Sequence, residues 1–96
     1  MPTRLKECEI LLRVTSEALN NVESELLSAE QRNAWRENAT RSLQAAVRKF
    51  MEAARDVRDD ERLAALRRRL QEQVSRLARH GITVDDDGRV LRRGAD

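Results

Sequence analysis

Apolar side chains recur at alternating intervals of three and four residues through three successive segments of the chain. This interval matches the turn of about 3.6 residues in an α-helix, so each segment is expected to be a helix with one buried face. The repeating positions are Leu5, Cys8, Leu12, Thr15, Leu19, Val22 and Leu26, then Trp35, Ala39, Leu43, Ala46, Phe50, Ala53 and Val57, and finally Leu63, Leu66, Leu70, Val74 and Leu77. Because the chain has one Trp, one Phe and no Tyr, its core must be built from Leu, Val and Ala, as in helix bundles.

Capping signals place the three predicted helices at about residues 3–27, 29–58 and 60–80. Ser28 followed three residues later by Gln31 fits a capping box at the start of the second helix. The apolar stripe changes phase at residues 59–60, which leaves two interpretations open: a turn before a separate helix, or one long helix with a local change of phase. The acidic run there suits the positive end of a helix dipole and favours the turn.

The chain beyond the third helix is rich in turn residues. Gly81 suits the left-handed position that ends a helix, and Asp87-Gly88, a dipeptide common in hairpin turns, separates two short β-prone runs at 82–84 and 89–91. Since an isolated hairpin is marginal in water, this one is expected to dock on the bundle, pair with another chain or stay partly disordered. We therefore predict an all-α antiparallel helical bundle of two long helices plus a third over residues 1–81, and a C-terminal β-hairpin or extended tail over residues 82–96.

The first helix carries more apolar surface than one buried face requires. Ile10, Leu11, Val14 and Ala18 form a second strip beside the first, and together the two strips cover more than half of the helix circumference. A surface helix needs an apolar arc of only about 100°. Helix 1 is therefore expected to be either central in its bundle or also buried against another subunit. Trp35 joins these four residues as a candidate interface anchor, although it could instead plug the end of the bundle.

Arginines recur every seven residues through the second and third helices. They are Arg41, Arg48, Arg55, Arg62, Arg69 and Arg76. On helices this spacing gives a one-sided basic stripe, which would suit the phosphate backbone of a nucleic acid. The competing interpretation is a solvated, salt-bridged flank, because residues 1–30 have a net charge of −3 and residues 31–96 a net charge of +5. Since no aromatic residues interleave with the arginines to stack on bases, the second interpretation is favoured.

The sequence offers little material for catalysis or metal binding. Cys8 lies on the apolar stripe, where a cysteine behaves as a small hydrophobe, and with His80 as the one histidine no His-based metal site or triad is available within one chain. The contiguous acids at 85–87 lack the alternating ligands and late glutamate of a calcium loop. We therefore expect no enzyme activity, no catalytic, cofactor-binding or metal-binding residues, and no small-molecule substrate.

The composition favours a cytoplasmic protein that acts by binding other macromolecules. No apolar run approaches the length of about 18 residues needed to span a membrane, no apolar signal-peptide stretch is evident, and one cysteine rules out an internal disulfide framework. The leading hypothesis is a protein–protein interaction module, an adaptor, assembly subunit or inhibitor of a larger complex, that forms a homo-oligomer through helix 1. The alternatives are a small nucleic-acid-associated protein using the arginine stripe, and a helical enzyme subunit completed by a partner.

Overall fold

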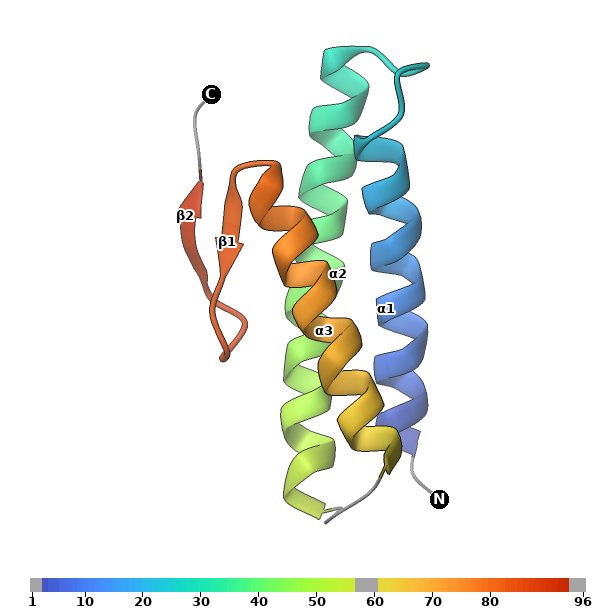
Figure 1. Cartoon of the computed structure of the whole chain (residues 1–96), viewed down its shortest axis with the longest axis vertical. Helices are drawn as coiled ribbons and strands as arrows, with labels where there is room; N and C mark the ends of the chain where they lie inside the picture. The colour runs from blue at the N-terminus through green and yellow to red at the C-terminus, as the bar shows by residue number, and fades with distance from the viewer. Residues whose placement is uncertain (1–2, 57–60, 94–96) are drawn as a thin grey trace.

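The structure is a computed structural model that describes residues 3–56 and 61–93, and in these ranges it contains three helices and a two-stranded hairpin. The elements are α1 (Thr3–Val22), α2 (Ala29–Asp56), α3 (Glu61–Arg79), β1 (Ile82–Val84) and β2 (Val90–Arg93). They form an elongated body of 43 × 24 × 16 Å, with the hairpin on the side of α3 that faces away from α1 (Figure 1). The predicted all-α bundle with a short C-terminal hairpin is confirmed.

Each helix runs antiparallel to the one before it (Figure 1). The chain reverses between Asp56 and Glu61, so the change of phase in the apolar stripe marks two separate helices, as the turn interpretation requires. The acidic residues Asp59 and Asp60, which favoured the turn, lie outside the described residues. The contact between α1 and α2 is the most extensive in the bundle, and α3 packs against both of these helices.

The first helix ends at Val22, earlier than the predicted boundary at residue 27. Val22 still faces the core and is 7% exposed, whereas Leu26, expected as the last position of the buried stripe, is 95% exposed. The N–H of Ser24 donates to the carbonyl of Asn21 (3.2 Å), and Ser24 Oγ accepts from the N–H of Leu26 (3.2 Å). A serine that bonds nearby backbone groups in this way offers the chain an alternative to helix, which explains the early end.

The second helix begins at the predicted capping box. The N–H of Gln31 donates to Ser28 Oγ (3.1 Å), and the N–H of Ser28 donates in return to Gln31 Oε1 (2.9 Å). Neither N–H has a carbonyl partner available one turn earlier in the helix, so the reciprocal bonds satisfy both. The helix therefore starts at Ala29, as the sequence indicates.

The core lies between the three helices and follows the predicted periodicity. Its largest fully buried side chains come from α1, α2, α3 and β1, and they include Leu5, Leu12, Leu19, Leu43, Leu77 and Ile82. Thr15 is also fully buried, and its hydroxyl lies within hydrogen-bond distance of two groups. It donates to the carbonyl of Leu11 (2.8 Å), and it lies 2.7 Å from Ser42 Oγ, where either hydroxyl can be the donor. Because the buried hydroxyl has partners, the stripe tolerates a polar residue at this position.

The hairpin docks on the bundle, which is the first of the three outcomes expected for it. Gly81, with φ of 92°, ends α3 and turns the chain into β1. Ile82 and Val84 of β1 are 1% and 5% exposed, so this strand supplies its own part of the core. β1 and β2 pair antiparallel, with a register shift between Thr83 and Val84. The second strand, Val90–Arg93, lies slightly later in the chain than the predicted run at 89–91.

Candidate protein interface

Two large hydrophobic side chains lie on the outer face of α1, opposite the core. Ile10 is 48% exposed and Val14 is 46% exposed, while Leu12 between them in sequence is fully buried. Residues four apart lie one above the other on a helix, so Ile10 and Val14 share one face. Burial of apolar surface is favourable by about 25 cal/mol per Å², which makes this pair a natural contact for another protein surface.

The other two residues of the predicted second strip turn toward α2. Leu11 is partly buried and packs against the core, and Ala18 is 1% exposed. Because α1 packs along α2 as well as against α3, its buried arc is wider than one stripe, and the small side chain of Ala18 fits within it. This packing accounts for part of the excess apolar arc. Ala18 therefore belongs to the core and offers no surface to a partner, which departs from the prediction.

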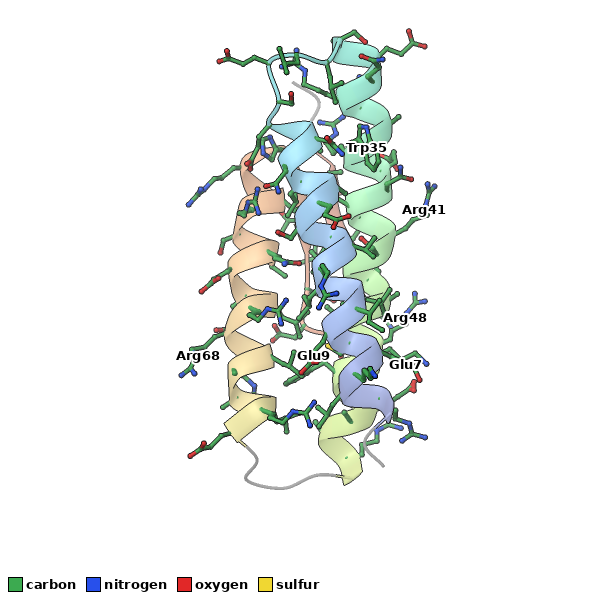
Figure 2. The ribbon with its side chains drawn as sticks, turned by 90° about the vertical axis from the view of Figure 1, so that its right-hand side faces the viewer. Glu7, Glu9, Trp35, Arg41, Arg48 and Arg68 are labelled. Carbon is green, nitrogen blue, oxygen red and sulfur yellow. The ribbon has the colours of Figure 1, made fainter. Side chains whose placement is uncertain are left out.

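Trp35 lies on the side of α2 next to α1 (Figure 2). It precedes Ser42 by one heptad, and Ser42 Oγ lies 2.7 Å from Thr15 Oγ1 of α1, so the heptad spacing puts Trp35 on the same α1-facing side. Its exposed fraction is 36%. The indole is thus partly packed and partly in solvent, at one end of the surface that α1 and α2 share.

Charged side chains flank Ile10 and Val14 along the helix. Lys6 lies four residues before Ile10 and Glu17 three residues after Val14, so both fall on the margin of the same outer face. Both are exposed, and neither forms an ion pair among residues 3–56 and 61–93. Glu7, by contrast, pairs with Lys49 Nζ of α2 (2.9 Å), and this hydrogen bond raises the pKa of Lys49.

The heptad-spaced arginines do not form one continuous stripe. Arg41 and Arg48 project from α2 on one side of the bundle, whereas Arg68 of α3 projects on the opposite side (Figure 2). The reversal of the chain between α2 and α3 divides the row into Arg41, Arg48 and Arg55 on α2, and Arg62, Arg69 and Arg76 on α3. A spacing of seven gives a common face only while one helix continues, and α2 and α3 are separate helices.

Two arginines of the α3 half are bound to α1. Arg62 Nη2 donates to Glu9 Oε1 (3.2 Å), and Arg76 Nη2 donates to Glu23 Oε1 (2.7 Å) and to Asn20 Oδ1 (3.1 Å). Residues 1–30 have a net negative charge and residues 31–96 a net positive charge, and these two pairs join carboxylates of the first part to arginines of the second. In these ion pairs the guanidinium groups are bound to carboxylates and are less available to phosphates.

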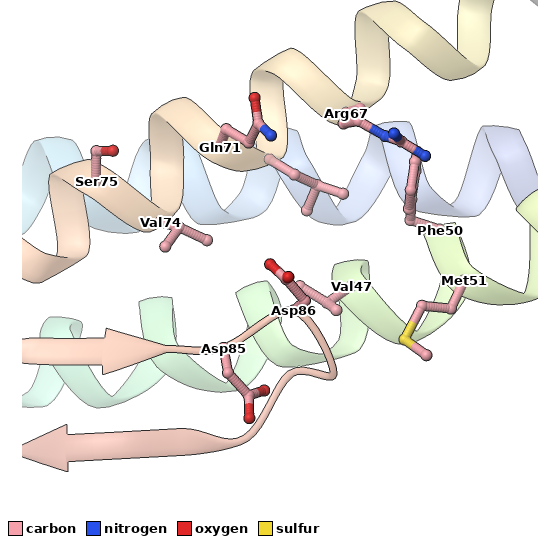
Figure 3. A pocket seen from close by; sticks show the side chains of 10 residues that line it. Val47, Phe50, Met51, Arg67, Gln71, Val74, Ser75, Asp85 and Asp86 are labelled. Atoms are coloured by element: carbon pink, nitrogen blue, oxygen red, sulfur yellow. The ribbon is translucent and has the colours of Figure 1, made fainter.

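A pocket of about 480 Å³ opens between α2, α3 and the hairpin turn (Figure 3). Its apolar lining is Val47, Phe50, Met51, Leu70 and Val74. The guanidinium of Arg67 lies 5.5 Å from the ring centroid of Phe50, and the Asp86 side chain points toward the pocket from the turn (Figure 3). No sequence signal identifies this pocket, because its walls come from three segments that only the tertiary fold brings together.

The acidic turn at residues 85–87 stabilises the hairpin. Asp85 Oδ1 accepts hydrogen bonds from the N–H groups of Asp87 (2.9 Å) and Arg89 (2.8 Å). This use of an aspartate side chain inside its own turn is common, and it accounts for Asp85 at this position. Within the ranges that the structure describes, no three His, Cys, Asp or Glu side chains are grouped so that they could hold a metal ion.

No helix in the described part of the chain is both long and apolar enough to cross a bilayer. Comparison with protein-family models, with curated proteins and with solved structures found no match for this chain.

Proposed function

We propose that this chain is a cytoplasmic, non-enzymatic protein–protein interaction module that binds a second copy of itself through the outer face of α1. In a larger complex it would act as an adaptor, an assembly subunit or an inhibitor. The observation that carries the proposal is the near half-exposure of Ile10 and Val14, side by side on a helix whose opposite face fills the core.

The arrangement of residues on this face favours a second copy over an unrelated surface. Ile10 and Val14 each lie two residues from position 12 along the helix. If two copies of α1 pack antiparallel about a two-fold axis that crosses the outer face at the height of residue 12, Ile10 of each copy lies against Val14 of the other. Self-complementarity of this kind is what a two-fold interface requires.

Two of the charges beside this face agree with the same antiparallel pairing. Lys6 and Glu17 lie on one margin of the face, near its two ends, and have opposite charges. The same two-fold axis pairs position 6 of one copy with position 18 of the other, so Lys6 lies one residue away from the position opposite Glu17. A parallel pairing would instead bring like charges together. Pairs of this kind set orientation more than affinity.

Nucleic-acid binding is not put forward as a second function. The arginine row is divided between α2 and α3, and Arg62 and Arg76 are bound to carboxylates of α1.

Sedimentation equilibrium of the full chain over a wide concentration range tests the proposal. We expect a reversible monomer–dimer equilibrium that Val14→Glu abolishes, because the substitution places two carboxylates in an apolar contact. Leu91→Glu is the matched control: Leu91 is 63% exposed on β2, so the same change of polarity there should leave the dimer intact.

A charge exchange tests the orientation separately. Lys6→Glu should weaken the dimer, since the new carboxylate faces Glu17 of the other copy, and adding Glu17→Lys should restore it. A native chain that stays monomeric throughout, or a dimer unaffected by Val14→Glu, would refute the proposed contact.

A further inference from the structure

A small hollow lies at the end of the bundle where α1 ends, α2 begins and α3 ends. Its volume is about 220 Å³. Its lining residues come from all three of these helix ends and from no part of the outer α1 face: Val22, Ala29, Arg32, Asn33, Arg36 and His80. The hollow is therefore separate from the proposed dimer contact.

Two guanidinium groups from α2 line this hollow without a carboxylate partner. Arg32 and Arg36 are four residues apart, so their side chains lie on the same face of the helix. Both residues are only partly exposed. Across the described residues, neither guanidinium has a carboxylate within ion-pair distance. Two neighbouring cations that are partly withdrawn from water repel each other, so an anion between them would be stabilising.

Arg36 also has a buried donor without an acceptor. Its Nη1 donates to the carbonyl of His80 (2.9 Å), which anchors the side chain to the end of α3. Its Nε is buried and has no hydrogen-bond partner among the residues that the structure describes. A buried donor left unpaired costs about 1–3 kcal/mol, and such groups in folded proteins commonly mark a bound water or ion.

The described residues that line the hollow include two arginines and no carboxylate. Glu23, the acidic residue nearest along the chain to Val22, is already bound to Arg76 (2.7 Å) and His80 (3.1 Å). Glu30 lies six residues before Arg36, which puts it about 120° away around the helix. Ala29 lines the hollow at the first turn of α2, where the helix dipole adds positive potential.

We propose that this hollow binds a phosphate group, either free or as the monoester of a small molecule. The guanidinium groups of Arg32 and Arg36 line one hollow beside the start of α2. Several N–H donors around one space suit the four oxygens of a tetrahedral oxyanion.

Titration of the full chain with inorganic phosphate at constant ionic strength tests this site. In ¹H–¹⁵N spectra we expect saturable shifts of the Arg36 Nε–H signal and of the amides at the start of α2. Arg32→Gln should weaken binding about tenfold or more. Because the side chain of Arg32 makes no hydrogen bond or ion pair in the described structure, this variant is expected to fold normally.

Arg68→Gln is the matched control, since it removes the same charge from an exposed position on α3 away from the hollow (Figure 2). Its phosphate affinity should equal that of the native chain. Shifts that never saturate would show general charge screening and overturn the site. An equal loss of phosphate affinity in Arg68→Gln and Arg32→Gln would do the same. Acetate binding as tightly as phosphate would overturn the assignment of the ligand.

Discussion

The side-chain amide of Gln44 donates a hydrogen bond to the carbonyl oxygen of Gly88 (2.8 Å) and so joins the hairpin turn to the middle of α2. Gly88 is buried and has φ of 84°, a conformation that other residues rarely adopt. A Cβ atom at this position would lie 3.3 Å from the carbonyl oxygen of Gln44 and 3.5 Å from the side chain of Val47. The approach of the turn to α2 therefore depends on the missing side chain as well as on the backbone conformation.

Gly88→Ala should destabilise the protein by about 1–3 kcal/mol, the usual cost of a strained backbone conformation. Urea unfolding measures this change. Gly88→Asn is the informative comparison, because asparagine tolerates a positive φ but still carries a Cβ atom. If Asn recovers most of the stability, the backbone conformation dominates, whereas equal losses would indicate the contact with α2. Native-like stability of Gly88→Ala would contradict the docking described here.

A buried amide on α3 provides the second prediction. Gln73 is 7% exposed; its Nε2 donates to the carbonyl of Leu12 (2.9 Å), while its Oε1 is buried without a partner. The Leu12 carbonyl also lies inside α1, where the helix ladder supplies it with a donor. Gln73→Met removes the unpaired acceptor and leaves no new one.

We therefore expect the free energy of unfolding of Gln73→Met to stay unchanged or to rise by up to about 1 kcal/mol. Urea unfolding monitored by circular dichroism gives this value. A loss of stability well beyond experimental error would mean that the bond from Gln73 to α1 contributes more than the unpaired oxygen costs.

The fold could be predicted from the sequence because local signals and the hydrophobic period agree. The capping bonds of Ser28 and Gln31 form as the motif indicates, and the left-handed Gly81 ends α3. The error at the end of α1 has a local cause: Leu26 continues the apolar period, but Ser24 bonds the backbone and the helix stops. The apolar period alone does not reveal that a side chain competes with the helix for backbone hydrogen bonds.

The contact surfaces were harder to predict because they depend on how the helices are placed. Whether Ala18 meets α2 or solvent is decided by the packing between helices, which the pattern within α1 does not contain. The arginine row looks continuous in sequence only because its spacing runs through the turn at which the chain reverses. The hollow beside Arg36 joins residues from three helix ends, and a sequence pattern does not reveal such a meeting.

The thiol of Cys8 provides the third prediction. It is fully buried in the core, 3.5 Å from the carbonyl of Ala46, and burial raises its pKa from 9.0 to about 11. Since the thiolate is the reactive form, Cys8 should not react with a thiol reagent at pH 8 in the native protein. Reaction should become complete in urea and, under native conditions, should be limited by opening of the bundle. Fast labelling of the folded protein would show that the core between α1 and α2 is open.

The carboxylate of Glu23 provides the last prediction, which concerns pH. Its pKa lies below the ordinary value of 4.5, first because Arg76 hydrogen-bonds to it and also because His80 does. A carboxyl group with a lowered pKa in the folded state stabilises the fold at pH values above its unfolded pKa, and this contribution is lost as the pH falls through the folded pKa. Because the Glu23 side chain is 38% exposed, the contribution should be below about 1 kcal/mol.

Glu23→Gln should therefore be less stable than the native protein at pH 7, and the two should converge as the pH falls below about 4.5. Urea midpoints measured from pH 7 to acid give this difference. Glu25→Gln is the control, because Glu25 is exposed and has no ion pair within the described residues, so its removal should produce no such convergence. A constant gap between native and Glu23→Gln across the whole range would mean that the pair with Arg76 does not bind the carboxylate preferentially. In that case the contact between the end of α1 and the end of α3 would rest on packing and on the hydrogen bond from Arg76 to Asn20.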